Sequence, residues 1–170
     1  MDIKIRIALP EESLILTEIA FSAKRTWDYP ESYFEIWKDE LTINEEYIRN
    51  NIVLKAIVNE DIAGFSSVVE VPEDFTSGKV FVGKGFWVEH IFIRPEYQQK
   101  GIGSKLLEKT CSLCIEKGIE ILKIFVDPYA EGFYKKEGAE FIYESPSSIE
   151  GRNIPVYQIN CKSGHKNKGK

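Results

Sequence analysis

The spacing of apolar and polar residues divides the first third of the chain into a strand and two helices. Isoleucine alternates with lysine and arginine across residues 3–7, which predicts a half-buried strand. Pro10 and the two glutamates after it open a helix whose apolar stripe runs to Lys24. Residues 27–30, Trp-Asp-Tyr-Pro, interrupt that stripe and end the helix before a second one through residues 33–37.

The next stretch predicts a hairpin. Residues 53–59 and 62–71 are strand-like and are separated by an acidic two-residue turn. Residues 45–51, before the hairpin, are polar and are assigned to no element. Residues 75–85, after it, are expected to form a loop.

The second half predicts a mixed sheet. Residues 86–93 and 121–126 are apolar on both faces and are separated by an amphipathic helix, as in a parallel strand pair joined by a crossover. Residues 140–143 and 155–160 predict two closing strands. Since the hairpins pair antiparallel and the crossover pairs parallel, the predicted fold class is α+β, a mixed α/β fold.

Composition narrows the organisation and the partners. A chain of 170 residues, 43% of them hydrophobic, fits one domain, which we place at residues 1–161. Residues 162–170 hold four lysines and are expected to be a disordered basic tail; removing these four positive charges from a net −5 leaves −9. Such an acidic body disfavours nucleic acid, and no apolar run has the roughly 18 residues of a membrane span, so a cytoplasmic protein is expected.

The cysteines indicate packing and not metal binding. Three cysteines do not form a disulfide framework, and Cys111 and Cys114 fall on the apolar stripe of the predicted helix. A zinc site needs further paired ligands, but His90 lies in a predicted strand and His165 in the tail. No metal is expected.

A glycine-containing turn between the strand at 86–93 and the following helix predicts a phosphate site. The turn reads Gln-Gln-Lys-Gly-Ile-Gly from Gln98, and its glycines and the first helical N–H groups can face an anion. A dinucleotide-binding loop needs a third glycine where Leu106 stands, and a P-loop needs four residues between its glycines. Both are therefore excluded.

A second motif downstream identifies the turn more closely. Residues 127–139 read Asp-Pro-Tyr-Ala-Glu-Gly-Phe-Tyr-Lys-Lys-Glu-Gly-Ala. The two motifs together resemble the GNAT superfamily of acyl-CoA-dependent N-acetyltransferases, with Tyr129 in place of a frequent asparagine and Ala139 in place of a phenylalanine. The resemblance implies a mostly antiparallel twisted sheet with a central splayed parallel strand pair, flanked by helices.

The resemblance also implies where acetyl-CoA, the cosubstrate, would bind. The backbone of the strand before the turn would pair with the pantetheine arm, the turn would hold the pyrophosphate, and the second motif would line the thiol end. The residues this assigns to cofactor binding are Ile91, Phe92, Ile93, Gln98, Gln99, Lys100, Gly101, Ile102, Gly103, Ser104, Asp127, Ala130, Phe133, Tyr134 and Lys136.

Acetyl transfer to an amine needs a base, because an alkylammonium with a pKa near 10.4 is not nucleophilic at neutral pH. Glu89 interrupts an apolar strand, where burial is expected to raise its pKa toward neutrality, and it is the predicted base. Its alternative roles are to order a water molecule or to bind the acceptor's ammonium. Tyr134 matches the family tyrosine beside the thiol and is the predicted acid, whereas His90, on the opposite face of the strand, is expected to be a core residue.

Acceptor binding is assigned to the aromatic residues of the first helices and to the late turn. Trp27, Tyr29 and Tyr33 either contact a cationic acceptor or pack in the core, and Arg152 is a candidate for an anionic group. We predict acetyl transfer to a primary amine, and we expect the acceptor to be a small molecule in preference to a protein. The alternatives are a non-catalytic acyl-CoA sensor and a protein-modifying acetyltransferase, and a homodimer is left open.

Overall fold

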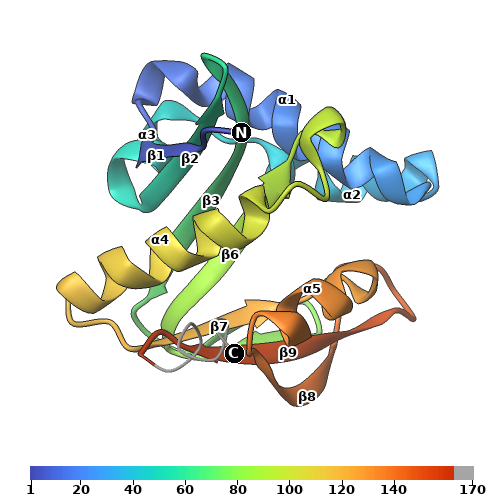
Figure 1. Cartoon of the computed structure of the whole chain (residues 1–170). Helices are drawn as coiled ribbons and strands as arrows, with labels where there is room; N and C mark the ends of the chain where they lie inside the picture. Colours follow the sequence, from blue (N-terminus) through green and yellow to red (C-terminus); the bar gives the residue numbers. More distant parts are fainter. Residues whose placement is uncertain (163–170) are drawn as a thin grey trace. The chain divides into compact units, whose positions relative to one another are not determined.

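The computed structural model describes residues 1–162 and divides the chain into two compact units. The first unit contains Met1–Val68 and His90–Thr110 (Figure 1). The second contains Val69–Glu89 and the chain from Cys111 onward. The strands β3 and β6 and the helix α4 therefore contribute residues to both units.

The elements follow the predicted order closely, with short 3-10 turns before or after several helices. The helices are α1 Ser13–Lys24, α2 Glu31–Leu41, α3 Glu45–Asn50, α4 Ile102–Glu116 and α5 Glu131–Lys136, with 3-10 turns η1 Pro10–Glu12, η2 Arg25–Trp27, η3 Pro95–Tyr97 and η4 Pro128–Ala130. The strands are β1 Lys4–Ile7, β2 Ile52–Val58, β3 Asp61–Val71, β4 Phe75–Ser77, β5 Val80–Val82, β6 Gly85–Ile93, β7 Ile121–Phe125, β8 Glu140–Pro146 and β9 Asn153–Asn160.

Seven strands form one mixed sheet in the order β1-β2-β3-β6-β7-β9-β8. The β6–β7 pair is parallel, with Trp87 opposite Lys123, and the hairpins β2–β3 and β8–β9 are antiparallel. The predicted fold class, a mostly antiparallel sheet with one parallel pair and flanking helices, is confirmed. The expectation that residues 75–85 form a loop is wrong in part, because β4 and β5 form a separate two-stranded hairpin there.

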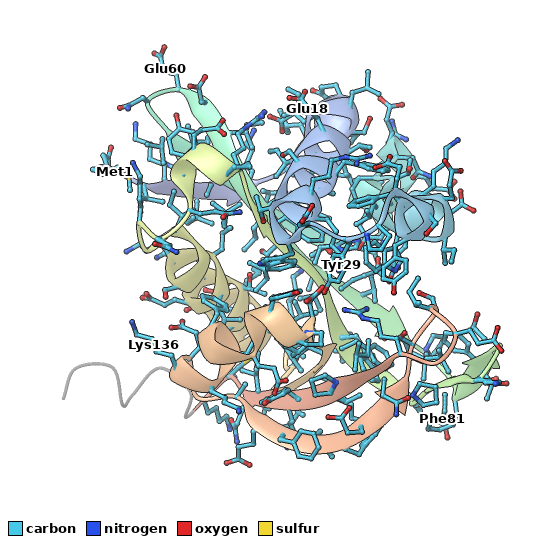
Figure 2. All side chains as sticks on the ribbon, turned by 90° about the vertical axis from the view of Figure 1, so that its right-hand side faces the viewer. Met1, Glu18, Tyr29, Glu60, Phe81 and Lys136 are labelled. Carbon is cyan, nitrogen blue, oxygen red and sulfur yellow. The ribbon has the colours of Figure 1, made fainter. Side chains whose placement is uncertain are left out.

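Helices cover both faces of the sheet in the first unit. Figure 2 shows α1 and α2 on one face of β3 and α4 on the other. Adjacent serines of β3 point to opposite faces: Ser66 is hydrogen-bonded to Thr110 of α4 at 2.8 Å, and Ser67 accepts a hydrogen bond from Tyr47 of α3 at 2.8 Å. Both serines are buried, so each hydroxyl satisfies a polar group inside the core.

Helix α3 occupies part of the stretch that the sequence left unassigned. Asn44 caps it, since its side chain accepts a 2.7 Å hydrogen bond from the backbone of Tyr47. Ile48 is the buried residue of this single short turn of helix. Because only one of its six side chains is buried, this helix has no periodic apolar pattern from which the sequence could predict it.

Close contact between β3 and β6 depends on Gly64. A Cβ atom at Gly64 would lie 2.6 Å from the carbonyl oxygen of Phe92 and 2.6 Å from the Cδ1 of Ile93. The first of these neighbours is backbone and cannot rotate away. Gly64 therefore sets the distance between β3 and the end of β6 that leads into the glycine-containing turn.

The core of the second unit contains stacked rings and three buried thiols. Trp87 stacks on Phe125 with ring centroids 4.6 Å apart, and the two pack with Val71 and Val156. Cys111, Cys114 and Cys161 are all buried and reduced, which confirms the packing role expected for the first two.

These thiols lie close enough together to interact. A hydrogen bond with Cys111, together with burial, raises the pKa of Cys161 to about 12. A hydrogen bond with Cys161 and burial raise the pKa of Cys114 above its usual range. The thiols of Cys114 and Cys161 are therefore protonated at neutral pH.

The two ends of the chain qualify two expectations. In β1 only Ile5 is half-buried, while Ile7 is 67% exposed, so this edge strand is more exposed than expected. Lys162, the first residue of the expected tail, forms a 2.7 Å ion pair with Glu120, and residues 163–170 lie outside the described part of the chain. Within residues 1–162, the helices lack the combination of length and apolar character needed to cross a membrane.

Candidate active site

The turn before α4 has the backbone geometry of an anion site. Gln99 and Gly101 have positive φ angles of 60° and 83°, which turn the chain sharply between η3 and α4. A Cβ atom at Gly101 would meet nothing within 4 Å, so glycine is needed there for conformation and the space beside it is open. Gln98 braces the turn, because its side-chain amide donates a 3.1 Å hydrogen bond to the carbonyl of Ile93.

The first turn of α4 supplies the donors. The earliest bond of the helix runs from the N–H of Lys105 to the carbonyl of Gly101, at 3.1 Å. The N–H groups of Ile102, Gly103 and Ser104 precede that bond and point out of the helix start. In a helix of fifteen residues this end carries a partial positive charge, which favours a phosphate.

Aromatic rings and one lysine gather where α1 connects to α2. The rings of Tyr29 and Trp37 are 5.1 Å apart, and those of Tyr33 and Trp37 are 5.4 Å apart, both edge to face. The ammonium of Lys24 lies 4.4 Å from the ring centroid of Trp37. Trp37 is buried, while Trp27, Tyr29 and Tyr33 are half-buried. These residues therefore pack together and also contact the ammonium of Lys24, and their role in binding a cationic acceptor stays a prediction.

His90 is a core residue, as expected. It is 4% exposed, and its ring stacks on Phe92 and lies 6.1 Å from the ring of Phe65. Burial, assisted by the positive charge of Lys24, lowers the pKa of His90 to about 3. His90 is therefore neutral at physiological pH.

Tyr134 lies in α5 and is buried, with 6% of its surface exposed. Burial first, and then the negative charge of Asp127, raise the pKa of the Tyr134 phenol above its usual range. The phenol is therefore protonated at any working pH. Its ring packs edge to face against the ring of Phe133, the preceding residue of the same helix, with ring centroids 4.9 Å apart.

Asp127 links three parts of the second unit. Its carboxylate caps η4 by accepting a 3.0 Å hydrogen bond from the N–H of Tyr129. The same carboxylate pairs with Arg152, with Nη2 and Oδ2 3.7 Å apart. The Arg152 side chain is thus engaged by an acidic residue of its own unit, and its role in binding an anionic acceptor group stays a prediction.

Glu89 differs from expectation in one respect. Its side chain is exposed, whereas the sequence predicted a buried carboxylate with a raised pKa. The two residues before it in β6, Trp87 and Val88, are buried, and Glu89 interrupts the apolar run of the strand. Strand β6 by itself does not bury the Glu89 carboxylate.

The predicted residues fall into two groups by unit. The residue that sequence reasoning missed is Lys24, and the available signal was its position at the end of a helix before an aromatic turn. The first unit holds Ile91, Phe92, Ile93, Gln98–Ser104, Trp27, Tyr29 and Tyr33; the second holds Glu89, Asp127, Ala130, Phe133, Tyr134, Lys136 and Arg152. Within residues 1–162, no group of three His, Cys, Asp or Glu side chains is placed to hold a metal ion.

Comparison with known proteins points to one family. Residues 16–139 match the model of the acetyltransferase (GNAT) family. Thialysine N-epsilon-acetyltransferase of Bos taurus is 31% identical over 74 residues, which are 42% of this chain and 44% of that protein. The chain thus aligns with less than half the length of this curated relative.

Solved structures share the fold over almost the whole chain. A GCN5-related N-acetyltransferase from Rhodopseudomonas palustris has a TM-score of 0.73 at 19% identity, covering 94% of this chain and 96% of its own. The PaiA N-acetyltransferase of Thermoplasma acidophilum, in complex with coenzyme A, has a TM-score of 0.69 at 20% identity and covers 94% and 99%. At these identities the likeness establishes the fold.

Proposed function

Because this chain belongs to the acetyltransferase (GNAT) family, we propose that it transfers an acetyl group from acetyl-CoA to a primary amine of a small molecule. The observation that carries the proposal is the turn at Gln99 and Gly101, which presents the N–H groups at the start of α4 beside open space. A small-molecule acceptor is favoured by the similarity to thialysine N-epsilon-acetyltransferase, an enzyme named for such an amine.

Acetyl-CoA binding would use the turn before α4 and the strand that leads into it. The amides from Gln99 to Ser104 would hold the pyrophosphate, with Lys100 adding positive charge. Backbone groups of Ile91, Phe92 and Ile93 would pair with the pantetheine arm. The bound coenzyme A in the Thermoplasma relative supports this cofactor for the fold.

The chemistry is a direct attack by the amine. Glu89 would take a proton from the acceptor's ammonium, directly or through a water molecule, and the free amine would attack the thioester carbonyl carbon. A C–N bond forms, the attacking nitrogen releases its remaining extra proton to solvent, the C–S bond breaks, and the thiolate of coenzyme A leaves. A backbone amide between Glu89 and Ile91 would stabilise the oxyanion. Since Glu89 is exposed, its burial would have to come from the bound substrates.

Tyr134 would assist the leaving thiolate. A phenol whose pKa is raised by burial and by Asp127 is a weak acid, but it stays protonated and can donate a hydrogen bond. Complete proton transfer from a phenol of pKa above 10 to a thiolate of pKa about 8.5 is uphill by at least ~2 kcal/mol. Tyr134 would therefore stabilise the developing negative charge on sulfur, and a proton from solvent would complete the thiol.

The free cysteines support a reducing compartment, and a cytoplasmic location is part of the proposal. Whether the chain pairs as a homodimer stays a prediction, which sedimentation of the purified chain tests.

The test is release of free coenzyme A thiol in the presence of acetyl-CoA and a panel of primary amines that includes thialysine. Wild-type protein should turn over at least one amine, and Glu89→Gln should lower kcat by about 10² to 10⁴. Glu70→Gln, at an exposed glutamate of β3 in the same unit, is the matched control and should keep wild-type turnover.

Two results would redirect the proposal. Tight coenzyme A binding without turnover of any amine would favour an acyl-CoA sensor, an alternative suggested by Tyr129 in place of the usual asparagine. Turnover with lysine-containing peptides but with no free amine would favour a protein-modifying acetyltransferase. Absence of coenzyme A binding in calorimetry would refute all three.

A further inference from the structure

Three rings surround the ammonium of Lys24 at the end of α1. Its Nζ atom lies 4.4 Å from the ring centroid of Trp37, 5.7 Å from that of Tyr29 and 5.8 Å from that of Trp27. All three distances are within the range in which a cation is attracted by the face of an aromatic ring. We call Trp27, Tyr29 and Trp37 the ring cage.

The ring cage is held in place by the backbone and by other rings. The chain leaves η2 through Asp28, which has a left-handed φ of 51°, and so brings Trp27 and Tyr29 to the same side as Trp37. Phe34 and Tyr33 contact Trp37 edge to face at 5.5 and 5.4 Å. The rings are therefore positioned by the fold, and a ligand need not order them.

The cage is also reachable from solvent. Lys24, Trp27 and Tyr29 are half-buried, while Trp37 forms the buried floor with 3% of its surface exposed. Figure 2 marks Tyr29 on the segment between α1 and α2. A site with a buried tryptophan floor and half-open ring walls is the arrangement that recognises ammonium ligands by cation–π attraction.

A lysine that only covers apolar surface would lay its methylenes on the rings and extend its charge into water. Lys24 instead places the charged atom itself over the ring of Trp37, 4.4 Å from its centroid and within the roughly 6 Å range of cation–π attraction. We propose that the ring cage is a binding site for alkylammonium ligands and that the Lys24 side chain occupies this site in the free protein. An external ammonium would bind in the cage after the Lys24 side chain has moved out of it. The proposal does not depend on acetyl transfer.

Removal of the occupant tests the proposal. Lys24→Ala deletes three methylenes and the ammonium, a group the size of n-propylammonium. Intrinsic tryptophan fluorescence reports binding, because two of the three tryptophans lie in the cage. Lys24→Ala should bind n-propylammonium chloride saturably and at least about tenfold more tightly than wild type, which must first displace Lys24.

Matched controls separate charge from space. The neutral 1-propanol, with the same number of heavy atoms, should bind Lys24→Ala at least about tenfold more weakly than n-propylammonium. Lys38→Ala removes the same atoms from an exposed position on α2 and should behave as wild type. Equal binding of the alcohol and the ammonium, or equal affinity in Lys24→Ala and wild type, would overturn the proposal.

A second variant covers the case in which Lys24→Ala does not fold. Lys24→Met keeps a flexible chain of similar length without the charge. It should bind n-propylammonium about threefold more tightly than wild type, because a thioether leaves the cage more readily than a cation. Wild-type affinity in Lys24→Met would contradict internal occupation by Lys24.

Discussion

The guanidinium of Arg152 lies 3.7 Å from the carboxylate of Asp127 and joins the turn between β8 and β9 to the end of β7. Both side chains are largely shielded, with 19% and 9% of their surfaces exposed. An ion pair in such a place depends on both partners, because a shielded charge that loses its partner keeps its desolvation cost.

Arg152→Met should therefore lower the free energy of unfolding by about 1–3 kcal/mol, measured in urea. The double variant Arg152→Met/Asp127→Asn should recover part of that loss, since it removes the shielded negative charge as well. Equal stability of Arg152→Met and wild type would show that the pair contributes nothing.

Gly64 and Gly101 predict opposite effects of the same substitution. Gly64→Ala should destabilise the protein by about 1–3 kcal/mol, because its Cβ would meet the backbone oxygen of Phe92 at 2.6 Å. Gly101→Ala meets no atom within 4 Å, so it should cost only about 1 kcal/mol for the φ of 83°, and should weaken coenzyme A binding instead.

Urea unfolding and calorimetric titration with coenzyme A measure the two effects separately. A Gly101→Ala protein that binds coenzyme A like the wild type would contradict the role given to the turn. A Gly64→Ala protein of unchanged stability would mean that β3 and β6 separate easily.

The buried His90 predicts a loss of stability in acid. Its pKa of about 3 in the folded state is below the usual 6.5 of an unfolded chain. Between these values the unfolded state binds a proton that the folded state does not, so stability is complete above pH 6.5 and falls as the pH drops toward 3. From pH 7.5 to pH 5 the contribution of His90 to this loss should be about 2 kcal/mol.

Chemical denaturation at several pH values measures this slope. His90→Gln, which cannot titrate, should be less stable at pH 7.5 but should show a flatter dependence between pH 5 and 6.5. The same slope in both proteins would assign the acid sensitivity to other groups.

Tyr134→Phe tests the role proposed for the phenol. Loss of a hydrogen bond to the developing thiolate should lower kcat by about 10–10² while the KM for acetyl-CoA changes little. Tyr143→Phe removes the hydroxyl from an exposed residue of β8 and should keep wild-type kinetics. An unchanged kcat in Tyr134→Phe would exclude this role.

Sequence reasoning located the elements whose apolar pattern is strong and missed those held by a few local contacts. The β6–α4–β7 segment has continuous apolar runs, and the bounds of its elements were predicted within two or three residues. The β4–β5 hairpin has exposed residues on both strands, and a hydrogen bond from the N–H of Lys84 to Asp74 closes it. No period in the sequence marks such a hairpin.

The candidate site divides in the same way. The turn at Gln98–Gly103 is local, so its glycines and its position between a strand and a helix could be recognised. The pairing of Arg152 with Asp127 and the exposure of Glu89 depend on contacts far apart in the sequence, for which residue spacing gives no signal. Lys24 was missed because a lysine at the end of a helix is usually solvated.

The burial of all three cysteines leaves the described surface without a reactive thiol. A maleimide reagent would therefore find no native site on the folded chain, and a single cysteine introduced at the exposed Lys100 would be a unique attachment point. A dye placed there would report on the turn before α4 in a background that requires no cysteine to be removed.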